Sequence, residues 1–347
     1  MFANGSAPPD PAMQVRPLLP PFRRYMDVCL IDVDSKIPNL ALMKASTWHK
    51  ERGDTVKLGY DPLFDHPDLC YISKLFDYSE LPPYLPDCET IRGGSGFGDL
   101  TVRMPMDDGS GAYDRIMPDY ELYYDRFPKI RYAMGRFTRG CPNHCPWCVV
   151  WRMDGNEVRH VADLSDFWCG QDEVRILDDN IMADEDELRR DCIQLRDAHV
   201  KVKWEALDIR LVTDHTAQSL AMVRKGNQLH FAWDGPAQDK YIENGIETLA
   251  RNGIRQYRLM FYILIGFNTT PEYDLYRVMK LKELGVDPFC MPFRHDGKAD
   301  PYCHFFARWC NNKFVFAKTP TFEDYTPWQN YLKEHPDYLE QMNGQAR

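Results

Sequence analysis

Short apolar segments with strand character alternate with helix-length segments along most of the chain, and this alternation constrains the fold more than any other feature. From Ile130 onward it predicts six strands with helices between them, as in α/β proteins with parallel sheets. The predicted strands are residues 131–137, 173–179, 201–206, 228–233, 257–265 and 287–292. The predicted helices are residues 162–168, 184–198, 215–225, 237–252 and 271–284. Six such units predict a partial (β/α)6 TIM-like barrel, in which chemistry takes place at the carboxyl ends of the strands.

A shorter series of strands precedes this barrel. Its first member is DVCLIDVDS (27–35), a short apolar run that ends in turn residues and therefore indicates a buried parallel strand. The other predicted elements are a helix from Leu40 to Arg52, strands at 55–60 and 69–76, and a strand that ends in the glycine-rich turn of ETIRGGSGFG (89–98). Strands spaced by helix-length segments predict a small doubly wound sheet. The glycines favour a tight turn, with close approach to a phosphate as the alternative.

Composition and local patterns divide the 347 residues into five segments. With 44% hydrophobic residues, the chain can bury a large core and form one large or two medium domains. We predict a poorly ordered proline-rich lead-in, a doubly wound domain, a polar linker without clear periodicity, the barrel, and a C-terminal helical extension. These segments span residues 1–24, 25–105, 106–129, 130–295 and 296–347, respectively.

Three cysteines, Cys141, Cys145 and Cys148, directly follow the first predicted strand of the barrel, in the run RFTRGCPNHCPWCVV. Thiolates are soft ligands that favour iron–sulfur clusters and zinc. A four-iron cluster needs four ligands, and the C-x3-C-x2-C spacing supplies three. A centre that is one ligand short can bind a substrate or cofactor at its open position, as catalytic zinc sites do. The motif and its context favour a [4Fe-4S] cluster.

Other interpretations of these cysteines are a zinc-bound interaction module, a disulfide framework and a non-catalytic electron-transfer cluster. A zinc site would need more ligands, but no second C-x2-C or H-x3-H pair follows at finger spacing, and the flanking cysteines leave His144 little freedom to bind. Eleven cysteines are an odd number, in a chain too large for a disulfide scaffold. Electron-transfer proteins usually complete the coordination shell with a fourth cysteine.

The cysteine motif and several other segments resemble the radical S-adenosylmethionine superfamily. The resemblance covers residues 25–325. The barrel is similar to the catalytic domain of that superfamily, and the first domain is similar to the Rossmann-like, cobalamin-binding-type domain that precedes it in some branches. The sequence is similar to a little-characterised group of this superfamily, and the matching segments are IPNLALMKAS, FTRGCPNHCPWCVV, ILDDNIMAD, ALDIRLVTD, LIGFNTTPEYDLYRVMKLKELGVDPFCMPF and ARWCNNK.

The resemblance implies that the three cysteines bind a four-iron cluster and that S-adenosylmethionine chelates the open iron through its methionine amine and carboxylate. One electron passes from the cluster to the sulfonium, and the carbon–sulfur bond breaks to give methionine and a 5′-deoxyadenosyl radical. The radical then abstracts a hydrogen atom from an unreactive carbon of the substrate. The protein positions the cofactor and excludes water and oxygen. A reducing partner such as flavodoxin or ferredoxin is expected to supply the electron.

The resemblance also implies cofactor contacts around the cysteines. Trp147 lies between the last two cysteines and is expected to pack against the adenine, or else to cover the cluster as a core aromatic. Asp178, Asp179 and Asn180 end the second predicted strand of the barrel, where the family approaches the methionine amine. The usual Gly-Glu pair of the family is missing from this position, and a capped helix start is the alternative role.

Three further cofactor-binding residues follow later strands. Arg210 is expected to hold the methionine carboxylate by a bidentate pair, in competition with structural pairing to Asp208 or Asp214. Asp234 ends the fourth predicted strand and is expected to bind the ribose or a substrate. Gly266 matches the glycine of a loop near the adenine.

The other eight cysteines bear on the question of a second cluster. Methylthiotransferases of this superfamily, which modify RNA, bind a second cluster through three N-terminal cysteines. Cys29 and Cys70 fall within predicted strands, where free cysteine usually behaves as a small buried hydrophobe. Cys303 and Cys310 lie seven residues apart, a spacing typical of the buried face of a helix. A methylthiotransferase-like enzyme stays open as an alternative.

Cobalamin is not expected in the first domain. Its lower-ligand histidine normally lies in an Asp-x-His-x-x-Gly run after the first strand, and the corresponding segment, DVDSKIPN, contains no histidine. If the domain keeps the fold, we expect it to dock a substrate or to brace the barrel.

The charge and hydropathy of the chain limit the classes of partner that it is expected to bind. The net charge of −10 argues against a nucleic-acid footprint over the whole surface, although five basic residues and no acidic one lie between Arg126 and Arg139. This stretch either attracts an anionic substrate or is a solvated strand flank. No apolar run approaches the length of a membrane span and no secretion signal is evident, so free thiols and a sensitive cluster predict a cytoplasmic protein. A modified nucleotide or RNA base, a peptide side chain and a small metabolite all stay open as substrates.

Overall fold

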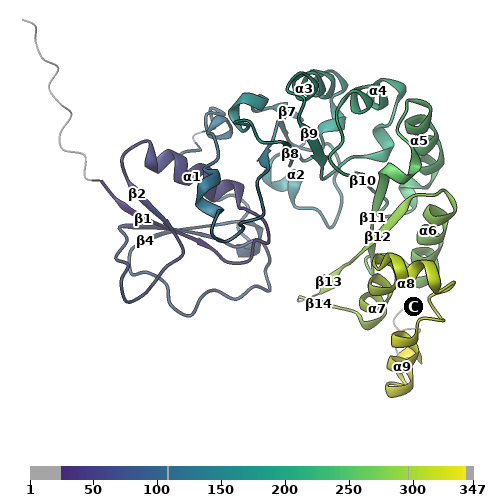
Figure 1. The fold of residues 1–347 in the computed structure, drawn as a ribbon. Helices are drawn as coiled ribbons and strands as arrows, with labels where there is room; N and C mark the ends of the chain where they lie inside the picture. Colours follow the sequence, from purple (N-terminus) through teal and green to yellow (C-terminus); the bar gives the residue numbers. More distant parts are fainter. Residues whose placement is uncertain (1–24, 108, 296, 341–347) are drawn as a thin grey trace, which may run out of the picture.

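The computed structural model describes residues 25–107, 109–295 and 297–340 and has a mixed α/β structure with parallel sheets (Figure 1). The predicted α/β class is therefore confirmed. The predicted lead-in, residues 1–24, lies outside the described residues. Within the described part of the chain, no helix combines the length and the apolar character that a membrane span needs.

Four parallel strands form the first sheet, in the order β2-β1-β3-β4. Their bounds are β1 (Asp27–Asp32), β2 (Thr55–Leu58), β3 (Leu69–Ser73) and β4 (Glu89–Gly93). Helix α1 (Leu40–Lys50) connects β1 to β2. It begins where the Asn39 side chain accepts hydrogen bonds from the backbone N–H groups of Ala41 and Leu42. The first three strands and the helix are present as predicted, and each ends two or three residues early.

The two faces of this sheet are covered differently. Val28 and Leu30 point to one face and pack against α1. Cys29 and Ile31 point to the other face and pack against the loop between β3 and β4, which includes Leu81. The structure thus differs from the predicted doubly wound sheet, because its described connections from β2 to β3 and from β3 to β4 are loops. Prolines, which interrupt helices, occupy these loops at positions 62, 67, 82, 83 and 86.

Six further parallel strands form two three-stranded sheets, in the orders β5-β8-β9 and β10-β11-β12. Their bounds are β5 (Ala133–Gly135), β8 (Glu173–Ile176), β9 (Lys201–Trp204), β10 (Leu229–Ala232), β11 (Leu259–Ile265) and β12 (Asp287–Pro292). A parallel bridge between Leu207 and Phe231 joins the end of β9 to β10, so the two sheets are neighbours. All six strands predicted for the second half are present.

Four helices lie along the outer side of these strands (Figure 1). Their bounds are α3 (Glu185–Asp197), α4 (Asp214–Met222), α5 (Asp239–Arg251) and α6 (Pro271–Glu283). Alternate strand residues such as Val174, Ile176 and Phe231 pack with helix residues such as Leu188 and Leu249 in the main core of the molecule. These four helices were predicted, at residues 184–198, 215–225, 237–252 and 271–284.

The segment between β5 and β8 differs from the prediction in two ways. Residues 162–168 hold a short 3-10 helix, Leu164–Asp166, in place of the predicted α-helix, because Phe167 turns into the core immediately after it. An antiparallel hairpin of β6 (Thr138–Arg139) and β7 (Arg159–His160) was not predicted. Strands of two residues are too short to carry a recognisable alternation.

The segment predicted as a polar linker, residues 106–129, packs closely against the first sheet. It contains two 3-10 helices, Tyr113–Arg115 and Tyr120–Tyr123. Tyr113 is 6% exposed and Tyr123 is 1% exposed, and the Tyr123 hydroxyl donates to the Asp32 carboxylate at 2.7 Å. Aromatic side chains therefore anchor this segment to the first sheet.

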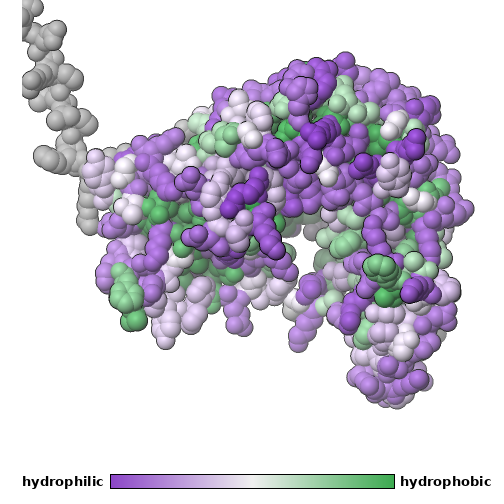
Figure 2. Space-filling model, in the orientation of Figure 1, coloured by the Kyte–Doolittle hydropathy of each residue, from purple (hydrophilic) through white to green (hydrophobic). Residues whose placement is uncertain are grey.

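The C-terminal region follows a short antiparallel hairpin. Its elements are β13 (Arg294–His295), β14 (Lys298–Ala299), α7 (Pro301–Asn311), α8 (Lys313–Lys318) and α9 (Thr326–Glu334). Buried aromatic side chains of α7 and α9, including Phe306, Trp309 and Trp328, join the main core. Figure 2 shows a hollow between the first sheet and the β13–β14 hairpin on an otherwise largely hydrophilic face.

Candidate functional site

The loop that carries the three cysteines lies between β6 and the short helix α2 (Val150–Met153), and the β6–β7 hairpin closes it. At its start, the Cys141 N–H donates to the Gly155 carbonyl at 3.1 Å. Near its end, the Cys148 N–H donates to the Cys145 carbonyl at 3.0 Å. These hydrogen bonds hold both ends of a loop that has no regular secondary structure of its own.

Gly140 is the residue at which the chain turns into this loop, with a φ of +94°. A Cβ there would lie 2.1 Å from the Glu157 carbonyl oxygen, so Gly140→Ala must displace the hairpin. We expect this substitution to lower the free energy of unfolding by about 1–2 kcal/mol for the positive φ and a further ~1–3 kcal/mol for the overlap. Gly155→Ala is the matched control, because Gly155 has a φ of +88° and open space around it. Equal losses in denaturant unfolding would contradict the steric argument.

A cavity of about 800 Å³ opens beside the loop. Residues that follow β8, β9 and β10 line it together with the loop, because the carboxyl ends of parallel strands meet at one edge. Its volume lies within the range of small-molecule sites, about 300–1,000 Å³. The predicted site residues that line it are Cys141, Cys145, Trp147, Cys148, Asp179, Asn180, Arg210 and Asp234.

The three thiols are free and half-buried. Burial raises the pKa of Cys145 and of Cys148, and neighbouring thiols of the motif raise both further. Three thiols on one loop are suitable ligands for an iron–sulfur cluster or for zinc.

Asp178 lies beneath the loop and does not line the cavity. Its side chain is buried and accepts hydrogen bonds from the Phe137 N–H at 2.9 Å and from the Thr138 N–H at 2.6 Å. The Thr138 hydroxyl also donates to it at 2.5 Å. Burial raises the pKa of Asp178 to about 6, although these hydrogen bonds act in the opposite direction. Asp178 therefore braces the turn from β5 into β6, which leads to the cysteines.

Asp179 and Asn180 follow Asp178 and line the cavity. Asp179 accepts a hydrogen bond from the Gly140 N–H at 2.9 Å and pairs with Arg136 at 2.5 Å. The Asn180 side-chain amide lies 3.7 Å from Cys141 Sγ and 3.4 Å from the Asp208 carboxylate. The Oδ1 atom of Asn180 is buried and accepts no hydrogen bond from the described residues. Because buried acceptors normally have a donor, this oxygen is available to a ligand in the cavity.

Arg210 and Asp234 stand at the ends of β9 and β10. Arg210 forms a bidentate pair with Asp208, with Nε at 2.8 Å and Nη2 at 2.6 Å from the carboxylate oxygens. This is the structural pairing that the sequence left open, and Asn143 of the cysteine loop also donates to Asp208 at 3.0 Å. Asp234 accepts a hydrogen bond from the Leu264 N–H at 3.2 Å, and burial raises the pKa of Asp234.

Trp147 connects the cysteine loop to the loop after β11. Its ring makes an edge-to-face contact with Phe267, with centroids 5.4 Å apart. The preceding residue, Gly266, has a φ of +77° and does not line the cavity. A Cβ at Gly266 would lie 2.7 Å from Cys303 Sγ, so glycine allows the close approach of α7. The structure thus places Gly266 as a packing residue against Cys303 of α7.

A polar network on the strands was missed by the sequence patterns. A Glu205 carboxylate oxygen lies 3.6 Å from Arg175 Nη1 and 3.7 Å from Lys203 Nζ. The other oxygen lies 3.7 Å from His230 Nδ1, which is 3.1 Å from the Tyr262 hydroxyl. Arg175, Lys203, His230 and Tyr262 alternate with core residues, so they occupy the strand face opposite the helices. Their signal in the sequence is a polar residue at every second position of an otherwise apolar strand.

Arg139, which directly precedes Gly140, ties the loop to the first half of the chain. Its Nε donates to the Asp114 carboxylate at 2.8 Å, and its Nη1 donates to Asp154 at 2.8 Å. The carbonyl of Asp114 in turn accepts a hydrogen bond from the buried Lys44 ammonium of α1 at 2.5 Å. One chain of polar contacts therefore runs from α1 to the entrance of the cysteine loop.

All eleven cysteines lie in the described residues and none of them forms a disulfide. Cys29 and Cys70 are buried and lie opposite each other on β1 and β3, and the partly buried Cys88 packs on the same face. Cys303 and Cys310 are buried on one side of α7. The prediction that these strand and helix cysteines are small buried hydrophobes is confirmed.

Comparisons with known proteins leave the function to be argued from this site. No protein-family model and no curated protein sequence matches the chain.

Proposed function

We propose that the protein is a radical S-adenosylmethionine enzyme, in which Cys141, Cys145 and Cys148 hold a [4Fe-4S] cluster with one open iron. The observation that carries the proposal is that three free thiols from one loop face a single cavity of about 800 Å³. When bound, the cluster and S-adenosylmethionine supply a radical that removes a hydrogen atom from a substrate. Iron–sulfur clusters are held by thiolates, and an incomplete set leaves a position for the cofactor.

The fold supports this proposal. We infer a partial (β/α)6 barrel, because β5 and β8 to β12 are parallel, follow chain order and meet at the bridge between Leu207 and Phe231. Barrels of this kind carry their chemistry at the carboxyl ends of the strands, where the cavity lies. The strand order of the first sheet, 2-1-3-4, matches that of Rossmann-like folds of the flavodoxin type, although loops replace two of the crossover helices.

The residues around the thiols can bind and orient the cofactor. The free Oδ1 of Asn180 and the Asp234 carboxylate are acceptors for an amine or hydroxyl group of a ligand. Trp147 offers an aromatic surface. Because Arg210 is already paired with Asp208, we assign it to positioning Asp208, which accepts a hydrogen bond from Asn143 of the cysteine loop.

Reconstitution with iron and sulfide under anaerobic conditions tests the proposal. We expect about four irons per chain with matching sulfide, and formation of methionine and 5′-deoxyadenosine when a strong reductant and S-adenosylmethionine are added. Zinc without sulfide would instead support a zinc-bound interaction module. Iron and sulfide without cleavage of S-adenosylmethionine would support an electron-transfer protein. Either of these results would overturn the enzyme proposal.

We further propose a reducing, cytoplasmic location and an electron donor such as flavodoxin or ferredoxin. Eleven unpaired cysteines are typical of compartments that keep thiols reduced.

A further inference from the structure

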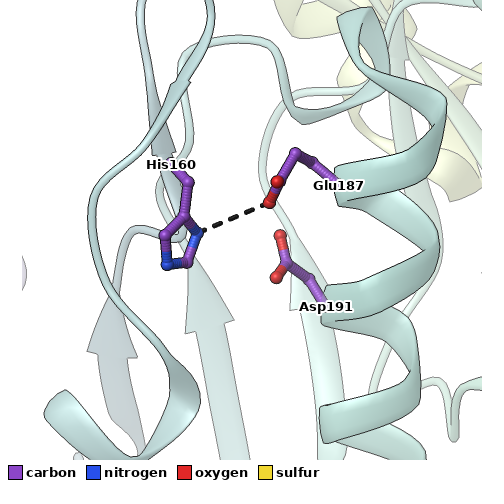
Figure 3. Close-up of side chains that lie close together, drawn as sticks. All are labelled: His160, Glu187 and Asp191. Carbon is purple, nitrogen blue, oxygen red and sulfur yellow. Dashed lines mark ion pairs between the residues drawn. The ribbon is translucent and has the colours of Figure 1, made fainter.

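A second group of ligating side chains lies apart from the cysteines, between β7 and α3. His160 of β7 faces Glu187 and Asp191 of α3, which are four residues apart and share one side of the helix (Figure 3). One ligand atom from each residue lies within 4.8 Å of the other two. His160 Nδ1 lies 3.5 Å from Glu187 Oε2. From these residues we propose a binding site for a divalent first-row transition cation.

The state of Asp191 is the second observation that points to a cation. Its side chain is fully buried, at 0% exposure, and its carboxylate points toward His160 and Glu187 (Figure 3). Neither oxygen accepts a hydrogen bond from the described residues. Buried carboxylates are normally hydrogen-bonded or paired, and an isolated one is costly. A cation between the three side chains would satisfy this carboxylate.

Arg190 is the cationic side chain that now faces this group. Its Nη2 atom lies 2.7 Å from Glu187 Oε2 and contacts His160 Nδ1, but it is 3.6 Å from Asp191 Oδ1. The Arg190 side chain is 44% exposed, so it can turn into solvent when a metal ion enters. The guanidinium therefore competes with the cation and leaves the buried carboxylate only partly compensated.

The ligand set selects the kind of cation. One imidazole nitrogen with two carboxylates suits Zn²⁺, Mn²⁺ or Fe²⁺, whereas Ca²⁺ and Mg²⁺ prefer oxygen ligands alone. Asp163 lies 3.7 Å from His160 Nε2, the usual place for a carboxylate that orients a metal-binding histidine. Bound here, the ion would tie β7, which closes the cysteine loop, to the helix that follows Asn180.

Titration of the full-length protein with Mn²⁺ tests this site independently of the proposed function. Mn²⁺ is a suitable probe because it prefers nitrogen and oxygen ligands to thiolates, so the three cysteines do not compete. The electron paramagnetic resonance signal of free Mn²⁺ should fall by one ion per chain. Loss of outer-shell partners alone typically weakens metal binding by about 10–100-fold, so Asp191→Asn, which removes a ligand, should weaken it by at least about 100-fold.

Two further variants separate this site from general attraction to acidic side chains. Glu185→Gln removes an exposed carboxylate from the first turn of the same helix and should leave Mn²⁺ affinity unchanged. Arg190→Met should raise the affinity, because it removes the competing guanidinium. An unchanged free Mn²⁺ signal at millimolar concentration would overturn the proposal. So would equal binding by Asp191→Asn and the wild type, with circular dichroism confirming that both are folded.

Discussion

Cys145→Ala is expected to abolish both the visible absorption of the reconstituted protein and the formation of 5′-deoxyadenosine. In the proposed cluster the loop supplies three thiols and one iron is already open, so no spare ligand remains. Cys145 lies in the middle of the motif and lines the cavity. Absorption spectra and product analysis under reductant measure the two effects on the same sample.

Cys169→Ala is the matched control for this experiment. Cys169 is an exposed free cysteine whose Sγ accepts a hydrogen bond from Gln171, and it does not line the cavity. Its loss should leave cluster content and cofactor cleavage at the wild-type level. If Cys145→Ala cleaved the cofactor at the wild-type rate, the assignment of Cys145 as an iron ligand would be wrong.

Arg277→Met is expected to lower the free energy of unfolding by about 3–5 kcal/mol. Arg277 of α6 is fully buried, and its Nη2 lies 2.5 Å from the Asp274 carboxylate. It also donates to the carbonyls of Trp233 at 2.6 Å and Leu264 at 2.9 Å. Methionine keeps much of the volume but leaves a buried carboxylate without its cation and two carbonyls without their donor. Because Trp233 precedes Asp234, the cavity should lose order as well.

Arg251→Met provides the comparison on the surface. Arg251 pairs with Asp214 at 2.9 Å, and the two side chains are 59% and 57% exposed. Exposed ion pairs contribute about 0–1 kcal/mol, so this variant should unfold within that range of the wild type. Urea unfolding followed by circular dichroism measures both variants. Similar losses at the two positions would show that the buried pair has no special role in stability.

The strands of both halves could be predicted from the sequence because each is a short apolar run bounded by turn residues. The antiparallel hairpin of β6 and β7 could not, since two residues show no alternation. The way in which the first sheet is covered could not be predicted from the sequence pattern either. Its second face is closed by a loop that contains Leu81 and several prolines, and a loop of this kind has no periodic signal.

The candidate site could likewise be predicted only in part. The cysteine spacing predicted a metal loop, and strand order predicted that the residues after β8, β9 and β10 would gather beside it. The direction of each carboxylate was not predictable, because Asp178 and Asp179 differ by one position and point to different partners. The sequence left Arg210 open between a ligand contact and structural pairing with Asp208 or Asp214, and in the structure it pairs with Asp208, two residues away. Such choices depend on tertiary contacts.

Because Arg139 contacts Asp114, we expect the second half of the chain to need the first half to hold the cysteine loop in place. A fragment that began at residue 130 would retain every cysteine of the motif, yet it would lose Asp114 and Lys44, which hold the entrance of the loop. Replacing the N-terminal half with a different one is therefore expected to change the position of the thiols, although it would not touch them directly. If the proposed metal centre forms, Lys44 and Asp114 would help to hold its loop in place, although neither residue lines the cavity beside the cysteines.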